Sequence, residues 1–198
     1  MLDSVYRGDV PWLRHEPDGS FRSDGRAPRL VFPGSFNPLH HGHIRLAELA
    51  AGRLGPPVAF ELSVANVDKP PLPPDEVHRR LAQFRGREPV YVTRAPTFRE
   101  KAALFPGCVF VVGADTAARV VHPRFYGEDP AAMLRALDEI RAAACRFFVG
   151  GRVDAGGRFV VVGGVTIPAA YRDLFAGLGE REFRVDVSST ELRGKGSG

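Results

Sequence analysis

The sequence predicts an α/β protein with an open parallel sheet and helices on both faces, and two observations support this prediction. From residue 29 onward, short apolar runs rich in β-branched and aromatic residues recur, as is typical of buried parallel strands. Between them lie stretches whose apolar residues recur every three or four positions, as on one face of an amphipathic helix. Because strands and helices alternate, we expect right-handed crossovers between the strands.

Each apolar run is assigned as one element in chain order. The predicted strands are residues 30–32, 58–60, 90–92, 108–112, 147–149, 159–162 and 183–187. The predicted helical stripes are Ile44, Ala47, Ala51 and Leu54; Val77, Leu81 and Phe84; and Met133, Leu137, Ile140 and Ala144. Pro168 is expected to open a further helix, with Leu174, Phe175 and Leu178 facing inward.

The proline-rich segment 69–74 cannot be a helix or a central strand, so we expect a stiff loop there. A helix is predicted to begin after it, near Asp75, and we expect Arg79 and Arg80 to be exposed on that helix.

The length of 198 residues fits one domain with a short extension. Residues 1–28 are polar and contain Asp-Gly turn signals, so we interpret them as an N-terminal extension with a loose hairpin. Residues 29–198 are predicted to form the main domain.

The composition excludes several classes of protein. With 44% hydrophobic and 25% charged residues, a fibrous or disordered chain is not expected. The sequence has no apolar stretch of about 18 residues and no apolar core of a signal peptide, so no membrane association is expected. Cys108 and Cys145 lie in or beside apolar runs, which favours reduced core residues and a cytoplasmic location.

The charge balance favours small anionic ligands. Lys and Arg number 27 against 23 Asp and Glu, and the basic residues are scattered rather than gathered in one run. We therefore expect no nucleic-acid partner, and a homo-oligomer is left open.

The first candidate site follows the first predicted strand of the main domain. Gly34 lets the backbone leave the strand by a tight turn, and His40 and His43 stand three residues apart in the first turn of a helix. Two imidazole donors at a helix N-terminus form a site for a phosphate, above all for charge that grows during a reaction. The alternatives are a capping turn with two solvated histidines and a metal pair, although metal ligands on a helix are more often four residues apart.

The second candidate site follows the strand predicted at 183–187. Ser188, Ser189 and Thr190 bring hydroxyl and backbone N–H groups to a helix start, and Arg193 follows one turn later on the same face. Ser188 and Glu191 also have the spacing of an ordinary capping box, so a plain helix start remains the alternative.

These two motifs together resemble the nucleotidylyltransferase superfamily and, within it, a divergent subgroup of the nicotinamide mononucleotide (NMN) adenylyltransferase family. The match is carried by Gly34-Ser35-Phe36-Asn37-Pro38-x-His40-x-Gly42-His43 and by Ser188-Ser189-Thr190-x-x-Arg193. The resemblance implies a Rossmann-like fold and transfer of AMP from ATP to the phosphate of NMN, giving NAD and pyrophosphate. It also implies Mg²⁺ that bridges the phosphates, with few or no protein ligands.

The site residues that we expect fall into three groups. Catalysis is assigned to His40, His43 and Arg193. ATP binding is assigned to Gly34, Ser35, Phe36, Gly113, Asp115, Ser188, Ser189 and Thr190. Mononucleotide binding is assigned to Asn37, Lys69 and Thr97. The acceptor's phosphate is already anionic, so we expect no general base, and catalysis by positioning and charge stabilisation.

The acceptor itself stays open. The family that the sequence resembles commonly carries an aromatic residue, often tryptophan, shortly before the threonine that Thr97 matches, and another after the Gly113-Ala114-Asp115 segment, whereas the single Trp here is Trp12. Phe125 or Tyr126 is the candidate replacement. The acceptor is NMN, nicotinate mononucleotide or another phosphorylated metabolite, such as phosphopantetheine or a sugar- or glycerol-type phosphate, with CTP as a further donor. A nucleotide-binding sensor without turnover is the non-enzymatic alternative.

Overall fold

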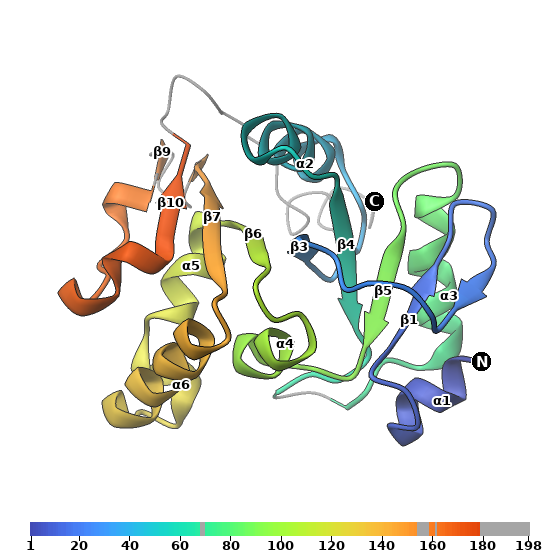
Figure 1. Cartoon of the computed structure of the whole chain (residues 1–198), viewed down its shortest axis with the longest axis horizontal. Coiled ribbons are helices and arrows are strands. Elements are labelled where there is room, and N and C mark those ends of the chain that lie inside the picture. Colours follow the sequence, from blue (N-terminus) through green and yellow to red (C-terminus); the bar gives the residue numbers. More distant parts are fainter. Residues whose placement is uncertain (68–69, 154–158, 161, 179–198) are drawn as a thin grey trace, which may run out of the picture.

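An eight-stranded sheet runs through the molecule in the order β10-β7-β6-β3-β4-β5-β1-β2 (Figure 1). The computed structural model describes residues 1–67, 70–153, 159–160 and 162–178. Neighbouring strands are parallel except at one edge, where β1 is antiparallel to both β5 and β2. The predicted class, a Rossmann-like α/β fold with a mostly parallel sheet between helices, is confirmed.

The elements have the following bounds. The strands are β1 Trp12–His15, β2 Phe21–Arg22, β3 Leu30–Pro33, β4 Val58–Ser63, β5 Val90–Thr93, β6 Val109–Gly113, β7 Arg146–Gly150, β8 Arg152–Val153, β9 Phe159–Val160 and β10 Phe175–Gly177. The α-helices are α1 Leu2–Arg7, α2 His41–Leu54, α3 Pro74–Leu81, α4 Phe98–Leu104, α5 Ala114–Val120 and α6 Pro130–Ala142. The 3₁₀ helices are η1 Ala82–Phe84, η2 Pro123–Tyr126, η3 Val162–Gly164 and η4 Ala169–Leu174.

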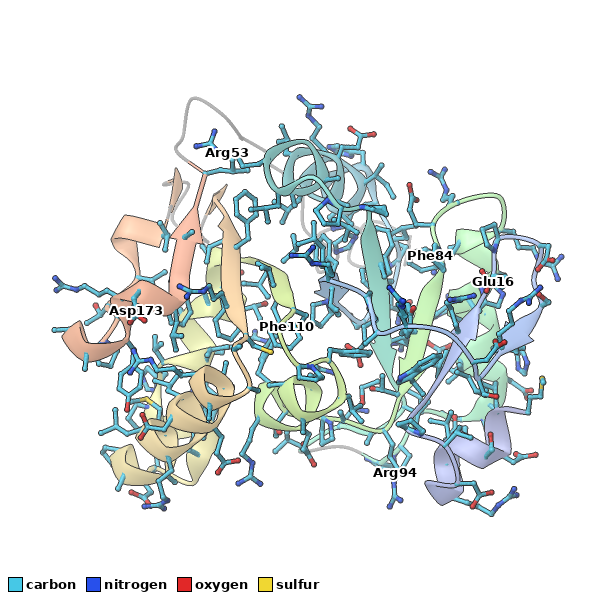
Figure 2. The ribbon with its side chains drawn as sticks, viewed as in Figure 1. Glu16, Arg53, Phe84, Arg94, Phe110 and Asp173 are labelled. Atoms are coloured by element: carbon cyan, nitrogen blue, oxygen red, sulfur yellow. The ribbon has the colours of Figure 1, made fainter. Side chains whose placement is uncertain are left out.

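The sheet separates two hydrophobic clusters. Neighbouring residues of β4 fall on opposite sides, with Phe60 in one cluster and Ala59 in the other, because side chains alternate along a strand. Helices α1, α2 and α3 contribute to the first cluster, and α4, α5 and α6 to the second. Figure 2 shows one phenylalanine of each, Phe84 near α3 and β5 and Phe110 near α4.

The order of the strands creates a switch point beside β3. From β3 the chain moves outward through β4 and β5, and then returns past β3 to β6 and β7 on its other side. Helices therefore leave the adjacent carboxyl ends of β3 and β6 toward opposite faces. In open α/β sheets this arrangement leaves a crevice in which ligands bind.

Most of the predicted strands are present in the sheet, and two predictions near the C-terminus are only partly correct. Residues 159–160 form β9, which pairs antiparallel with β8 outside the main sheet, and Val162 begins η3. The helix expected after Pro168 is only the 3₁₀ helix η4, and Phe175 begins β10, which lies parallel to β7. The ring of Phe175 stacks on Phe147 with centroids 4.7 Å apart, so a tertiary contact overrides the helical spacing. The strand predicted at 183–187 lies outside the described residues.

Residues 1–28 contain the expected hairpin, formed by β1 and β2. Strand β1 also pairs with β5 along four residue positions, from Trp12 opposite Thr93 to His15 opposite Val90. The N-terminal segment is thus continuous with the main sheet, and α1 adds Leu2 and Val5 to the first cluster.

The predicted helices at 44–54, 77–84 and 133–144 are present, with two differences of detail. The buried face of α2 consists of Leu46, Ala47 and Ala50, whereas Leu54 is exposed at the helix end. Ala144 lies beyond α6 and is exposed. Among the residues described, no helix is both long and apolar enough to cross a membrane. Both cysteines are free and buried, with Sγ atoms 3.9 Å apart.

Candidate active site

Helix α2 begins just after the loop that leaves β3, and its start carries the two histidines of the sequence motif. His40 is the N-cap residue, with extended backbone, and His43 follows in the first turn. Their rings stack with centroids 3.7 Å apart and planes inclined by 24°. The backbone N–H of His40 donates to Nδ1 of His43 over 3.3 Å. In neutral His43 the ring proton is therefore on Nε2, which makes that atom a hydrogen-bond donor.

Two core phenylalanines restrict the ring of His43. Phe32 and Phe36 approach it edge-on, with centroid distances of 5.8 and 5.2 Å. Both phenylalanines are buried. Because its ring is packed on these neighbours and stacked on His40, the direction of Nε2 is set before any ligand arrives.

The loop between β3 and α2 makes a tight return onto the core. A Cβ at Gly34 would lie 2.6 Å from Cζ of Phe36, so only glycine fits under this ring. Phe36 has a positive φ of 44° and is 1% exposed, packed against Phe60 and Phe84. The Phe36 side chain thus belongs to the core, so the predicted contact with ATP would be made by the backbone of Phe36.

Helix α3 and η1 hold this loop through its backbone. Nη1 of Arg80 donates to the carbonyl of Ser35 over 2.9 Å. The Gln83 amide makes two bonds to this loop, with Nε2 donating to the Phe36 carbonyl at 2.9 Å and Oε1 accepting from the Leu39 N–H at 2.8 Å. Three successive contacts therefore define the path of the chain from Ser35 to Leu39.

A group of three charged residues on α3 supports the same loop. Glu76 accepts hydrogen bonds of 2.7 Å from both Arg79 and Arg80. Hydrogen bonds from Arg79, and then from Arg80, lower the pKa of Glu76 to about 2. The Glu76 carboxyl group is therefore ionised at neutral pH. Arg79 also donates to Oδ1 of Asn37 over 2.7 Å. Asn37, a predicted mononucleotide contact, is thus oriented from α3.

The expectation that Arg79 and Arg80 are both exposed is wrong for Arg80. Arg79 is exposed, but Arg80 is only 8% exposed. The buried face of α3 is made by Val77 and Leu81, and position 80 lies on that face, one turn after Val77. The spacing of the apolar residues in the sequence therefore already indicated that Arg80 is buried.

A cleft of about 1060 Å³ opens along the carboxyl ends of the parallel strands. Gly34 and Ser35 line it after β3, Ser63 at the end of β4, and Pro96 after β5. From the other side, Arg119 of α5 lies over the ring of Phe125, 5.8 Å from its centroid. Phe125 lines the cleft and is 47% exposed. Of the two aromatic candidates, Phe125 is the one at the cleft.

The cleft floor contains an ion pair that the sequence analysis missed. Nζ of Lys101 donates to both carboxylate oxygens of Glu61 at 2.8 Å and to the carbonyl of Ala95 at 2.6 Å. The Thr93 hydroxyl donates to Oε1 of Glu61 over 2.5 Å. Glu61 interrupts an apolar strand, which was the available signal, but nothing in the sequence connects it to Lys101. The pair joins the segment after β5 to β4.

The remaining predicted residues within the described part lie near this edge of the sheet. Thr97 is the N-cap of α4, and its hydroxyl accepts from the Glu100 N–H and donates to the Glu100 carboxylate. Gly113 ends β6 and caps α5, and Asp115 lies in the first turn of α5. Thr97 is therefore bound into a capping box, although Pro96 and Phe98 on either side of it line the cleft.

Lys69, Ser188, Ser189, Thr190 and Arg193 lie outside the described residues. The roles assigned to these five residues therefore stay predictions.

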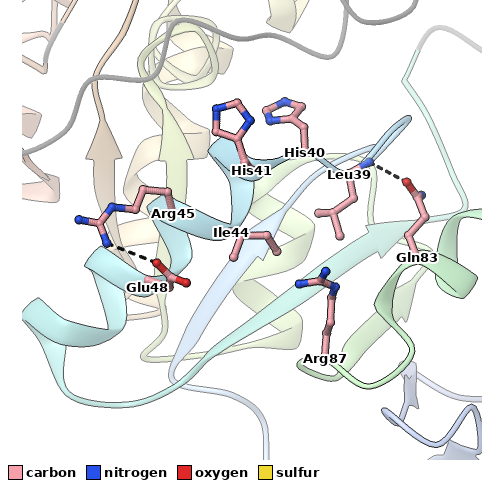
Figure 3. Close-up of a pocket in the computed structure, with 8 residues that line it drawn as sticks. All are labelled: Leu39, His40, His41, Ile44, Arg45, Glu48, Gln83 and Arg87. Carbon is pink, nitrogen blue, oxygen red and sulfur yellow. Dashed lines mark hydrogen bonds and ion pairs between the residues drawn. The ribbon is translucent and has the colours of Figure 1, made fainter.

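A second cavity, of about 670 Å³, lies at the start of α2, with Gln83 of η1 on its other side (Figure 3). His40 and His41 stand side by side at its rim, with Leu39 and Ile44 below them and Arg87 opposite. His41 is exposed. Gly34 and Ser35, at the start of the loop, line the cleft, whereas Leu39 and His40, at its end, line this groove. The part of the chain described contains no group of three or more His, Cys, Asp or Glu side chains suited to a metal.

Comparison with known proteins gives one family. A model of cytidylyltransferase-like proteins matches residues 31–195, which include both terminal motifs. No curated protein matches the chain. The match begins within β3 and spans the switch point, the histidine pair and the cleft. The chain therefore belongs to the cytidylyltransferase-like family, and its general activity is that of a nucleotidyltransferase.

Proposed function

We propose that this protein is an adenylyltransferase that moves AMP from ATP to the phosphate of a mononucleotide, with NMN as the acceptor to test first. The observation that supports it is the stacked, pre-oriented pair of His40 and His43 at the start of α2, beside the Gly34–Ser35 turn that lines the cleft. Hydrogen-bond donors at a helix N-terminus stabilise charge on phosphate oxygens.

In this proposal an oxygen of the acceptor phosphate attacks the α-phosphorus of ATP in line, and the bond to the β-phosphate breaks to release pyrophosphate. His40 and His43 donate to α- and β-phosphate oxygens, on which negative charge grows. Arg193, with Ser188, Ser189 and Thr190, holds the β- and γ-phosphates. No residue needs to remove a proton, because the attacking oxygen is already ionised.

The other assigned residues position the two substrates. Gly113 and Asp115 contact the ribose or adenine of ATP, and the backbone of Gly34, Ser35 and Phe36 approaches its phosphates. Asn37 and Lys69 contact the acceptor. Thr97 contributes to the acceptor side through its backbone, because its hydroxyl is bonded to Glu100.

Mg²⁺ enters this proposal as part of the MgATP substrate. It supplies positive charge that links the phosphate oxygens. In this proposal the phosphates themselves would hold the ion, with few or no protein ligands.

The direct experiment is incubation of the purified protein with MgATP and either NMN or nicotinate mononucleotide. We expect a dinucleotide and pyrophosphate in equal amounts, measured by chromatography and a coupled pyrophosphate assay. A double variant, His40→Ala with His43→Ala, is the matched control and should form neither product.

The family description keeps a second candidate in view. A cytidylyltransferase-like chain could use CTP, with a sugar- or glycerol-type phosphate as acceptor. The same assay with CTP and a panel of phosphorylated acceptors separates the two. Tight ATP binding with no pyrophosphate from any acceptor would instead indicate a sensor.

A further inference from the structure

Arg80 is a buried cation at the wall of the cleft, although it comes from α3 rather than from a strand end. Its side chain is 10% exposed, and it lines the cleft together with Gly34 and Ser35. No sequence motif includes it, and the mechanism above does not use it. Burial of a charge is costly unless it is paired and hydrogen-bonded, so the partners of this guanidinium decide whether it has capacity for a ligand.

Two bonds orient this guanidinium. Nε donates to Oε1 of Glu76 over 2.7 Å, and Nη1 donates to the Ser35 carbonyl over 2.9 Å. Among the residues that the structure describes, Nη2 has no acceptor. The planar guanidinium is therefore held at Nε and Nη1, and the two N–H groups of Nη2 remain for a further partner.

The charges around Arg80 leave an excess of positive charge. The carboxylate of Glu76 is shared with Arg79, to which it also bonds at 2.7 Å. One ionised carboxylate thus faces two guanidinium groups. The group as a whole carries a net positive charge, which an anion in the cleft would balance.

Lys101 provides the contrast within the same cleft. Its ammonium donates twice to Glu61 and once to Ala95, so all of its donors are used and the pair is neutral. Lys101 is suited to holding the fold together, whereas Arg80 retains both charge and donors.

We propose that Arg80 binds the phosphate monoester of the acceptor. This inference rests on the proposed function, since it takes the cleft as the acceptor site. A phosphate at Nη2 would lie next to the Ser35 turn, because the same guanidinium bonds the Ser35 carbonyl. Arg80 would thus bring the acceptor phosphate to the loop that ends at the two histidines.

The test compares Arg80→Met, which keeps an unbranched apolar side chain and removes the charge, with Arg85→Met as the matched control. Arg85 is an exposed arginine just after η1 that does not line the cleft. Inorganic phosphate is the probe, titrated by calorimetry, so that the result does not depend on which acceptor is correct. We expect phosphate affinity to fall about tenfold or more in Arg80→Met, the size expected for a charged hydrogen bond, and to stay within about twofold in Arg85→Met.

Kinetics give the second readout. Arg80→Met should raise KM for the phosphorylated acceptor by about tenfold or more and leave KM for ATP within about twofold. The Ki of the dephosphorylated acceptor, nicotinamide riboside, should stay unchanged, because it lacks the group that Arg80 binds. Arg80→Gln, which is neutral but keeps an amide donor, is the substitute if the methionine variant does not fold.

Two outcomes would overturn the inference. One is unchanged phosphate affinity in a folded Arg80 variant, even with a lower kcat or Tm, which would leave Arg80 only a structural role. The other is a wild type that binds no phosphate. Absence of turnover with NMN, by contrast, would contradict the proposed function while the phosphate titration still decides the role of Arg80.

Discussion

Helices α2 and α4 begin with the same capping motif, but the capping side chains differ in their chemistry. Each start is a capping box, made by His40 and His43 in α2 and by Thr97 and Glu100 in α4. In α4 the hydroxyl and the carboxylate satisfy each other, and the negative charge lies at the positive end of the helix. In α2 the first turn has no acidic residue, and the capping groups are imidazoles.

The difference shows how one backbone motif serves two purposes. Glu100 would repel a phosphate at the start of α4, so that end stabilises the fold. Farther along α4, Lys101 is also fully paired, with Glu61. At α2 the polar groups can instead face an anion, and Phe32 and Phe36 supply the packing that holds the histidine ring. The predictions below test this division.

The largest effect on stability is expected from Lys101→Met. It leaves the Glu61 carboxylate buried without its partner, which typically lowers the free energy of unfolding by about 3–5 kcal/mol. Urea denaturation measures the loss. The double variant Glu61→Leu with Lys101→Met should recover most of it, and a single variant as stable as the wild type would show that the pair contributes little.

The largest effect on activity is expected from His43→Ala. If its Nε2 donates to charge that develops on the phosphates, kcat should fall about 10²-fold or more. Pyrophosphate release under saturating substrates is the measurement, with circular dichroism to confirm folding. Near-normal turnover of the folded variant would remove the histidine pair from the mechanism.

Thr97→Ala should reduce stability and have little effect on activity. Loss of the N-cap is expected to lower the free energy of unfolding by about 1 kcal/mol, and kcat should change less than about threefold. Thermal denaturation and steady-state kinetics check both numbers. A large rise in KM for the acceptor would show that the Thr97 hydroxyl contacts substrate after all.

The smallest effect concerns His15 in β1, a histidine remote from the loop. Burial, and then the positive charge of Arg85, lower the pKa of His15 below the ordinary value of 6.5. The unfolded chain therefore binds more protons below that pH, and stability should decrease as the pH falls through and below about 6.5. Above it, His15 contributes no slope. Unfolding free energies measured from pH 5 to 8 should show a flatter profile for His15→Phe, and an identical profile would contradict the assignment.

Much of the fold was predictable, because long helices and buried central strands carry strong periodicity. The run 108–112, which overlaps β6 at Val109–Gly113, and the buried stripe of Val77, Leu81 and Phe84 were identified correctly. Strand β10 was not, since its three residues depend on the stacking of Phe175 on Phe147, a contact that local spacing does not encode. The hairpin was expected, but its pairing with β5 was not.

The candidate site was predictable where it is contiguous in sequence. The Gly34–His43 segment forms a turn and helix start as expected. The sequence did not reveal which distant side chains meet: Arg80 reaches Ser35, 45 residues away, and Lys101 reaches Glu61, 40 residues away. These contacts join side chains on separate helices and strands, so no spacing rule within one segment reveals them.

The pairing of β1 with β5 has a consequence for how this protein can be shortened. Strand β5 would be the border of the sheet without the hairpin, and its backbone N–H and C=O groups would then face water along Val90–Thr93. Exposed borders of this kind pair readily with other chains and promote aggregation. The first 28 residues therefore protect the edge of β5 from pairing with other chains. A variant that starts at residue 29 keeps the candidate catalytic residues but should be less soluble.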